Sequence, residues 1–326
     1  MDQLYTFELP ENLIAQVPAS PRDHARLLVY DRATKTITDD YFYNLCDYLP
    51  KDTFVVANNT KVSHCRYLFH DSKTEIFVVE AVDDKTVRAM IRPGKKFKLG
   101  ESTVLNDGLV VTTTHIDDDG IRTLQFNRPR SDVRLFRASH VPLPPYIEQN
   151  DVLADEYQTI YAKNEGSLAA PTAGLHFTPE LKEKVSKQFG WEEINLEVGL
   201  GTFAPMSHKN FETKTLHQEH YEVSEDTYSR IKTAKHVTCV GTTSLRTLES
   251  VSRTGELAGS TDIFIQPGDS FLRVNSLITN FHLPSTSLLL LVEAFIGSRS
   301  ELEKIYTHAI TGKYRFYSFG DAMLVV

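Results

Sequence analysis

Three short stretches rich in glycine, threonine and histidine are the places where this chain could carry out chemistry. The first, VGTTSLR, runs from Val240 to Arg246 and joins a predicted strand to a predicted helix. Open backbone N–H groups at such a helix start suit a carboxylate or a phosphate. Thr242 and Thr243 add hydroxyl groups, and Arg246 can supply a charge-assisted hydrogen bond. We expect an anionic group to bind here, although an ordinary capped turn explains the same residues equally well.

The second stretch, EVGLGTF, places Gly199, Gly201 and Thr202 directly after a predicted strand that ends near Glu197. It lacks the third glycine and the following helix of a dinucleotide-binding fingerprint, so that kind of site is excluded. Two glycines still allow the backbone to lie against a flat ligand. A turn that needs positive φ angles is the alternative explanation.

The third stretch, AAPTAGLHFT, contains Thr172 and Ala173 and leads into a predicted helix. We expect Gly174 to make this loop flexible and to let the backbone approach a ligand. His176 lies two residues before the predicted helix cap at Thr178, where it could donate to a ligand or carry a proton. A single histidine in such a place is more often structural.

Two further groups of polar side chains add candidates for binding and proton transfer. His217 and Glu219 lie in LHQEHYE, and Asn280 and His282 lie in TNFHLP ahead of an apolar helix. The histidine spacing does not match zinc ligands, and no CxxC pair is present, so we expect no metal site. Capping or packing would also explain Asn280 and His282.

Strand and helix patterns alternate over most of the chain and would position these loops. The segment TFVVANNT, residues 53–60, is typical of a buried strand, and Thr178 and Gly190 predict the start and end of a helix. Ser298 and Glu301 form a capping box for another helix. This alternation indicates an α/β domain with a largely parallel sheet, in which ligands bind beyond the carboxyl ends of the strands.

Residues 61–145 have a different character. Short β-branched runs alternate with turns rich in aspartate and glycine, which predicts an antiparallel module and, we expect, a small β-barrel. Because α/β patterns lie on both sides, the barrel is predicted to be an insertion into a discontinuous α/β domain formed by residues 1–60 and 146–326.

Charge is unevenly distributed between these regions. The whole chain of 326 residues carries a formal net charge of −8, but residues 61–141 contain 14 lysines and arginines against 11 aspartates and glutamates. The first of two basic clusters consists of Arg92, Lys95, Lys96 and Lys98. The second spans 128–137. Such local clusters suit phosphate groups, and solvated turns are the alternative.

The remaining composition points to a cytoplasmic protein. The N-terminal residues MDQLYTFELP lack the features of a signal peptide, and the longest apolar run, Leu288–Val292, is too short to cross a membrane. Cys46, Cys65 and Cys239 are far apart in the sequence and are expected to be free thiols.

Longer motifs, taken in order, resemble the S-adenosylmethionine:tRNA ribosyltransferase-isomerase family of queuosine synthesis. They are ELPENLIAQVPASPRDHARLLVYDR, PLPPYI, EYQTIYA, SLAAPTAGLHFT, EVGLGTF, VGTTSLRTLES, ITNFHLPSTSLLLLVEAF and YRFYSFGDAML. The similarity extends from Phe7 to Leu324. It implies transfer and isomerisation of the ribosyl part of S-adenosylmethionine onto 7-aminomethyl-7-deazaguanine at the tRNA wobble position. The products would be epoxyqueuosine, adenine and methionine.

The resemblance also implies partners and roles. S-adenosylmethionine would be a co-substrate, no cofactor would be permanently bound, and a monomer would act on a tRNA anticodon loop away from any membrane. His176, His217 and Glu219 are the candidates for catalytic proton transfer, and the general base is not identified among them. The expected substrate-binding residues are Thr172, Ala173, Gly174, Glu197, Gly199, Gly201, Thr202, Thr242, Thr243, Arg246, Asn280 and His282. The first basic cluster would contact tRNA.

Seven positions depart from the usual pattern of that family. They are Asn59 in place of aspartate, Lys61 and Glu156 in place of arginines, Glu197 and Lys214 in place of histidines, Leu216 in place of methionine, and Ser285 in place of lysine. Three accounts follow: a divergent member with the same activity, a paralogue that uses another nucleoside or nucleic acid, or a homologue that binds RNA without catalysis.

Overall fold

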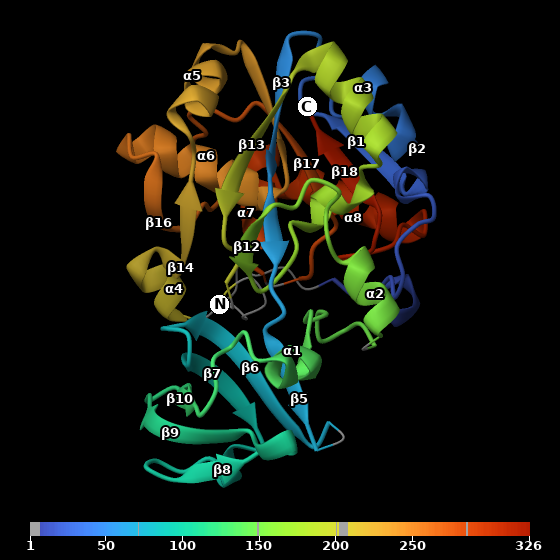
Figure 1. Cartoon of the computed structure of the whole chain (residues 1–326). Coiled ribbons are helices and arrows are strands. Elements are labelled where there is room, and N and C mark those ends of the chain that lie inside the picture. Colours follow the sequence, from blue (N-terminus) through green and yellow to red (C-terminus); the bar gives the residue numbers. More distant parts are fainter. Residues whose placement is uncertain (1–6, 71, 149, 200, 202–207, 285) are drawn as a thin grey trace. The chain divides into compact units, whose positions relative to one another are not determined.

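A computed structural model describes residues 7–70, 72–148, 150–199, 201, 208–284 and 286–326 of the chain (Figure 1). The chain forms two compact units. The first unit comprises Met1–Lys61, Pro144–Glu148 and Asp155–Val326, and the second comprises Val62–Leu143 and Gln149–Ala154.

The first unit is built around a nine-stranded sheet. Its strands, in spatial order, are β16 (Ala258–Ile263), β14 (Thr215–Glu222), β13 (Trp191–Leu196), β3 (Thr53–Asn58), β15 (His236–Val240), β17 (Ser276–Asn280), β18 (Ala322–Val325), β1 (Arg26–Asp31) and β2 (Thr36–Tyr41). A short two-stranded sheet pairs β4 (Thr60–Val62) with β12 (Asn164–Ser167).

The nine-stranded sheet is mixed, which corrects the prediction of a largely parallel one. Strands β13, β3, β15 and β17 are parallel neighbours, as are β18 and β1. The other four pairings are antiparallel. Strands β1 and β2 illustrate the cause, because residues 32–35 alone connect them, and so short a connection permits only antiparallel pairing.

Helices cover both faces of this sheet. They are α3 (Pro179–Phe189), α4 (His208–Thr213), α5 (Glu225–Thr233), α6 (Thr242–Thr254), α7 (Ser287–Ile296) and α8 (Arg299–Thr311), with 3-10 helices η1 (Glu11–Leu13), η2 (Arg22–His24), η3 (Phe42–Asp47) and η6 (Thr172–His176). Alternate residues of each strand point to opposite faces. Val56 of β3 therefore packs in the core beneath α5–α8, while Val55 packs in the core beneath α3 and η3.

Local signals set the helix ends as predicted. The Thr178 hydroxyl accepts the Leu181 N–H at 3.2 Å to start α3, and Gly190 ends it with a φ angle of 88°. The Ser298 hydroxyl accepts the Glu301 N–H at 3.4 Å at the start of α8. The three cysteines are free and buried.

The second unit is a curled, entirely antiparallel sheet. Its strands, in spatial order, are β11 (Ser139–His140), β5 (Arg66–Phe69), β6 (Thr74–Ala81), β7 (Thr86–Arg92), β10 (Arg122–Phe126), β9 (Val110–Ile116) and β8 (Ser102–Val104). Short helices η4 (Gly94–Lys96), η5 (Asn106–Gly108) and α1 (Val133–Ala138) accompany it, and α2 (Asp151–Glu156) joins the two units.

This sheet is open rather than a closed barrel. In the described part of the chain, β8 and β11 each pair on one side only, so no ladder closes the ends. Strand β11 contains two residues and β8 three, and edges this short expose few unpaired backbone groups. The expectation of a barrel is therefore correct for the strand type and curvature but not for closure.

Candidate functional site

A cavity of about 190 Å³ lies beyond the carboxyl ends of β13, β15 and β17 in the first unit. This is the edge of an α/β sheet where small-molecule sites usually form. The lining residues come from segments distant in sequence: Pro145, Tyr146, Tyr157, Ala169–Ala173, Val198, Gly241–Thr243, Thr279–Leu283, Thr286, Leu288, Tyr317 and Ser318. Six of the predicted substrate-binding residues are among them, namely Thr172, Ala173, Thr242, Thr243, Asn280 and His282.

One wall of the cavity is the start of α6. Gly241 has a φ angle of +89°, a left-handed conformation that other residues adopt only with strain. The N–H groups of the first helical turn have no partner inside the helix and carry its positive partial charge. The Thr243 hydroxyl oxygen is buried and has no hydrogen-bond partner in the described part of the chain. This wall can therefore bind an anionic or strongly polar ligand group.

Arg246 lies one turn further along α6 and forms a buried ion pair with Glu219 of β14. The second carboxylate oxygen of Glu219 accepts the Gly199 N–H at 3.1 Å. Nε and Nη2 of Arg246 are buried and have no hydrogen-bond partner among the described residues. Neither side chain lines the cavity, but Val198, next to Gly199, does. Glu219 thus fixes Arg246 through one nitrogen of its guanidinium group, and Nε and Nη2 are left without a partner among the described residues.

The opposite wall follows β17. Nδ2 of Asn280 donates to the Tyr317 carbonyl at 2.9 Å, whereas its Oδ1 is buried without a hydrogen-bond partner among the described residues. His282 Nε2 lies 2.9 Å from the Thr279 hydroxyl. Burial lowers the pKa of His282 to about 4, so its imidazole is neutral at pH 7.

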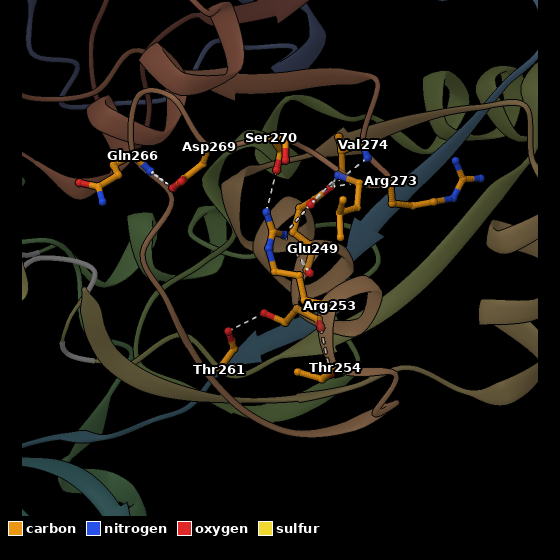
Figure 2. Close-up of polar contacts among 11 residues, drawn as sticks. Glu249, Arg253, Thr254, Thr261, Gln266, Asp269, Ser270, Arg273 and Val274 are labelled. Carbon is orange, nitrogen blue, oxygen red and sulfur yellow. Dashed lines mark hydrogen bonds and ion pairs between the residues drawn. The ribbon is translucent and has the colours of Figure 1, made fainter. Parts of the chain in front are cut away.

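Away from the cavity, Glu249 joins the two elements that carry these walls, because it lies on α6 and binds the segment that leads into β17 (Figure 2). Its buried carboxylate accepts N–H groups from Leu272, Arg273 and Val274 at 2.9–3.1 Å. Arg253 donates to the same carboxylate at 2.6 Å and to the Ser270 carbonyl at 2.7 Å. A charged acceptor with this many donors is among the stronger polar contacts in a protein.

His176 lies behind the cavity and is not among its lining residues. Its ring packs on Phe42 at 5.0 Å between centroids, and Nε2 has no hydrogen-bond partner in the described chain. Burial lowers the pKa of His176 to about 4, although the carboxylate of Asp321 opposes that shift and the side chain of Asn280 lies nearby. His176 therefore reaches the cavity only through Asn280.

The expectation that Gly174 makes its loop flexible is wrong. Residues 172–176 form η6, a tight 3-10 turn that is largely buried. A Cβ atom at Gly174 would lie 2.0 Å from the Tyr161 hydroxyl and 2.9 Å from Thr159. The glycine is required for close packing rather than for mobility.

Several other predicted residues form a second group across β13 and β14. A Cβ on Gly201 would lie 2.6 Å from His217, so the exposed histidine packs directly on this glycine. Glu197 packs in the same way on Gly166, where a Cβ would lie 2.8 Å from its carboxyl carbon. Thr202 lies outside the described residues.

An aromatic wall of the cavity was not predicted as part of the site. The rings of Tyr146 and Tyr317 lie 4.3 Å apart, and the Tyr146 hydroxyl is 2.6 Å from that of Ser318. Tyr317 has a φ angle of 72°, an unusual conformation for a bulky residue. Burial raises its pKa to about 12. The sequence signals were PLPPYI and YRFYSFGDAML, which mark the family without assigning a role to either tyrosine.

The departures from the family pattern are accommodated locally where the structure describes them. Glu156 forms an ion pair with Arg22 at 2.8 Å. Asn59 accepts a hydrogen bond from the side chain of Asn164 at 3.1 Å. Lys214 is exposed and has a φ angle of 55°. Ser285 lies outside the described residues.

In the second unit, the first basic cluster lies around η4, between β7 and β8. Phe97 is fully buried beneath it, and Arg122 donates to the carbonyls of Phe97 and Gly94 at 3.1 and 3.3 Å. This anchor leaves Lys95 and Lys96 exposed. The remaining two members, Arg92 and Lys98, are also exposed.

The described residues show neither a metal-binding cluster nor a membrane-spanning helix. No group of three or more histidine, cysteine, aspartate or glutamate side chains is placed to hold a metal ion. No helix within the described ranges is long and apolar enough to span a membrane.

The fold and the cavity define a class of protein: a mixed α/β unit with a polar ligand site at its sheet edge, joined to a curled antiparallel unit. The chain belongs to the queuosine biosynthesis protein family, whose model matches residues 2–325. An S-adenosylmethionine:tRNA ribosyltransferase-isomerase of Thermotoga petrophila is 42% identical over 99% of this chain and 98% of that protein. One from Desulfitobacterium hafniense is 44% identical over 99% and 98%.

A solved structure agrees with this assignment. The crystal structure of S-adenosylmethionine tRNA ribosyltransferase from Thermotoga maritima matches with a TM-score of 0.57 and 34% identity, over 98% of this chain and 99% of that one.

Proposed function

We propose that this protein transfers and isomerises the ribosyl group of S-adenosylmethionine onto 7-aminomethyl-7-deazaguanine at the wobble position of tRNA. The products are epoxyqueuosine, adenine and methionine. Relatives about 40% identical over nearly the whole chain carry the name of this activity. The observation that carries the proposal is the cavity at the start of α6, whose mainly apolar lining includes the buried, unpartnered oxygens of Thr243 and Asn280 and so suits a ligand with a carboxylate and a flat base.

Within this proposal each wall of the cavity binds a different part of S-adenosylmethionine. The first turn of α6 and the Thr243 hydroxyl bind the carboxylate of the methionine part. The rings of Tyr146 and Tyr317, whose planes are tilted by 49° to each other, offer aromatic faces for a base. Arg246 does not line the cavity and supports the site through its ion pair with Glu219, which accepts the Gly199 N–H.

Proton transfer is required at two points, because loss of adenine begins with removal of a C5′ proton beside the sulfonium and ends with protonation of the base. His217 and Glu219 are candidates for these steps, with Glu219 limited by its ion pair to Arg246. We assign His176 a positioning role through Asn280, since it does not line the cavity. The proposed substrate site is completed by the remaining predicted residues, Glu197, Gly199, Gly201 and Thr202.

The proposed RNA partner is the anticodon loop, in which an unpaired base can be splayed into a pocket. The antiparallel unit, as an inserted domain, contacts the tRNA backbone through Arg92, Lys95, Lys96 and Lys98. We propose that the enzyme acts as a monomer in the cytoplasm.

A substitution at Thr243 tests the site. Incubation with S-adenosylmethionine and an anticodon stem-loop carrying the aminomethyl-deazaguanine should release adenine and increase the RNA mass. Thr243→Val preserves shape and removes only the unpartnered hydroxyl, so it should raise KM for S-adenosylmethionine about 3- to 10-fold without lowering Tm. Thr254→Val, at the far end of the same helix, is the matched control, because its hydroxyl donates to the Ser250 carbonyl at 2.9 Å and accepts the Glu256 N–H at 3.2 Å, and Thr254 does not line the cavity.

The outcomes are distinct. No adenine release by the unmodified protein with this RNA would contradict the proposed activity. If the protein releases adenine but neither Thr243→Val nor Thr254→Val changes KM for S-adenosylmethionine, the methionine part binds elsewhere.

A further inference from the structure

The second basic cluster, residues 128–137, contains an exposed aromatic side chain that has no role in the site described above. Phe136 of α1 is 65% exposed, and Val133 beside it is 56% exposed. The helix is fixed to the sheet by Leu135, which is fully buried, and by the Asp132 side chain, which caps it through the Arg134 N–H. Phe136 is therefore held outward by a short, anchored helix.

A second ring lies beside it. His64, which precedes β5, is exposed and lies nearly parallel to Phe136, with 6.0 Å between ring centroids and 20° between ring planes. One face of Phe136 is thus supported by a flat polar ring. A large exposed apolar side chain in a surface of mixed character commonly marks an interaction site.

The charges around these rings favour an anionic partner. Arg128 and Arg137 are exposed and form no hydrogen bond or ion pair with any residue in the described ranges. Two acidic side chains of this unit are already paired, since Asp132 binds Arg134 at 2.7 Å and Glu75 binds Arg66 at 2.8 Å. Available cations beside an exposed aromatic ring are the features that bind single-stranded nucleic acid.

We infer that Phe136 and His64, with Arg128 and Arg137, form a binding surface for an unpaired nucleotide of the RNA substrate. The base stacks on Phe136, and the two arginines contact the neighbouring phosphates. This inference rests on the proposed function for its RNA partner. This surface is a second RNA contact, in addition to the one proposed for the first basic cluster around η4. Stacking on Phe136 of α1 tolerates any base, because every base has a flat aromatic face.

Stacking can be separated from apolar burial by two substitutions at one position. Phe136→Leu keeps an apolar side chain and removes the aromatic face, so the Kd for an unmodified anticodon stem-loop should rise roughly 5- to 150-fold in fluorescence anisotropy. Phe136→Trp restores the face and should bind at least as tightly as the unmodified protein. KM for S-adenosylmethionine should stay within twofold in both.

Val104→Ala is the matched control, because Val104 is a 66% exposed apolar residue of β8 in the same unit. Arg137→Gln should reduce the slope of log Kd against log salt by about 1, as loss of a phosphate contact predicts. Circular-dichroism melting verifies that each variant is folded.

Three results would overturn the inference. One is unchanged RNA binding in Phe136→Leu, and another is an equal loss in Val104→Ala. The third is a loss of self-association in Phe136→Leu, detected by sedimentation, with RNA affinity unchanged, because a second copy of the chain would then be the partner. Failure of the proposed function is separate, since the unmodified protein would then release no adenine.

Discussion

Acidification should destabilise the protein through His176, and the size of the effect follows from its burial. The folded protein holds this imidazole neutral with a pKa near 4, whereas the unfolded chain gives histidine its ordinary value near 6.5. Between these two values the unfolded state binds more protons, so stability falls as pH decreases. Stability from this group is fully present above pH 6.5 and is lost progressively toward pH 4.

At pH 5 the difference amounts to about 2 kcal/mol relative to pH 7.5, or roughly a 30-fold change in the unfolding equilibrium constant. In a chain of 326 residues it corresponds to a shift in Tm of about 3 °C. Other titrating groups contribute as well, so the contribution of His176 must be obtained by difference.

His176→Gln keeps a polar side chain of similar length and cannot titrate in this range. Urea unfolding of both proteins at pH 7.5 and pH 5.0 gives the pH-dependent loss for each, and the loss should be smaller in the variant by about 2 kcal/mol. An equal loss in the two proteins would show that His176 is accessible to protons in the folded state. It would then be a candidate for direct proton transfer after all.

Two further substitutions test the walls of the cavity. Glu249→Ala leaves three N–H groups and Arg253 without their acceptor and should lower the free energy of unfolding by about 3–5 kcal/mol, whereas Glu249→Gln, which keeps one acceptor, should lose less; urea titration compares them. Tyr317→Gly should raise KM for S-adenosylmethionine while leaving Tm nearly unchanged, because relief of the left-handed strain, about 1–2 kcal/mol, offsets the lost ring packing. A large drop in Tm would show that the ring is mainly structural.

Features that depend on neighbouring residues in sequence were predictable. The ends of α3 at Thr178 and Gly190 and the start of α8 at Ser298 follow from capping chemistry that extends over a few residues. The polar turn after β15 was predictable for the same reason. Asp132 gives the same kind of capping signal for α1, whereas the arginines around it indicate only a basic surface.

Features that depend on distant contacts were not predictable. The sequence around Gly174 suggests a flexible loop, because nothing in that segment reveals the Tyr161 hydroxyl against which the glycine packs. The Tyr146–Tyr317 wall joins segments that only the folded sheet brings together. The parallel or antiparallel direction of the outer strands likewise depends on the connections between them.

The hydrogen bonds that Glu249 forms between α6 and the segment leading into β17 have a consequence for the energetics of ligand binding. Helix α6 and the segment that leads into β17 are joined, away from the cavity, by a buried carboxylate whether or not a ligand is present. Little conformational entropy therefore remains to be lost by the cavity walls that these elements carry when the cavity fills, and preorganisation of this kind raises affinity without any added contact. The same rigidity means that a ligand of the wrong shape meets a surface that does not adapt to it.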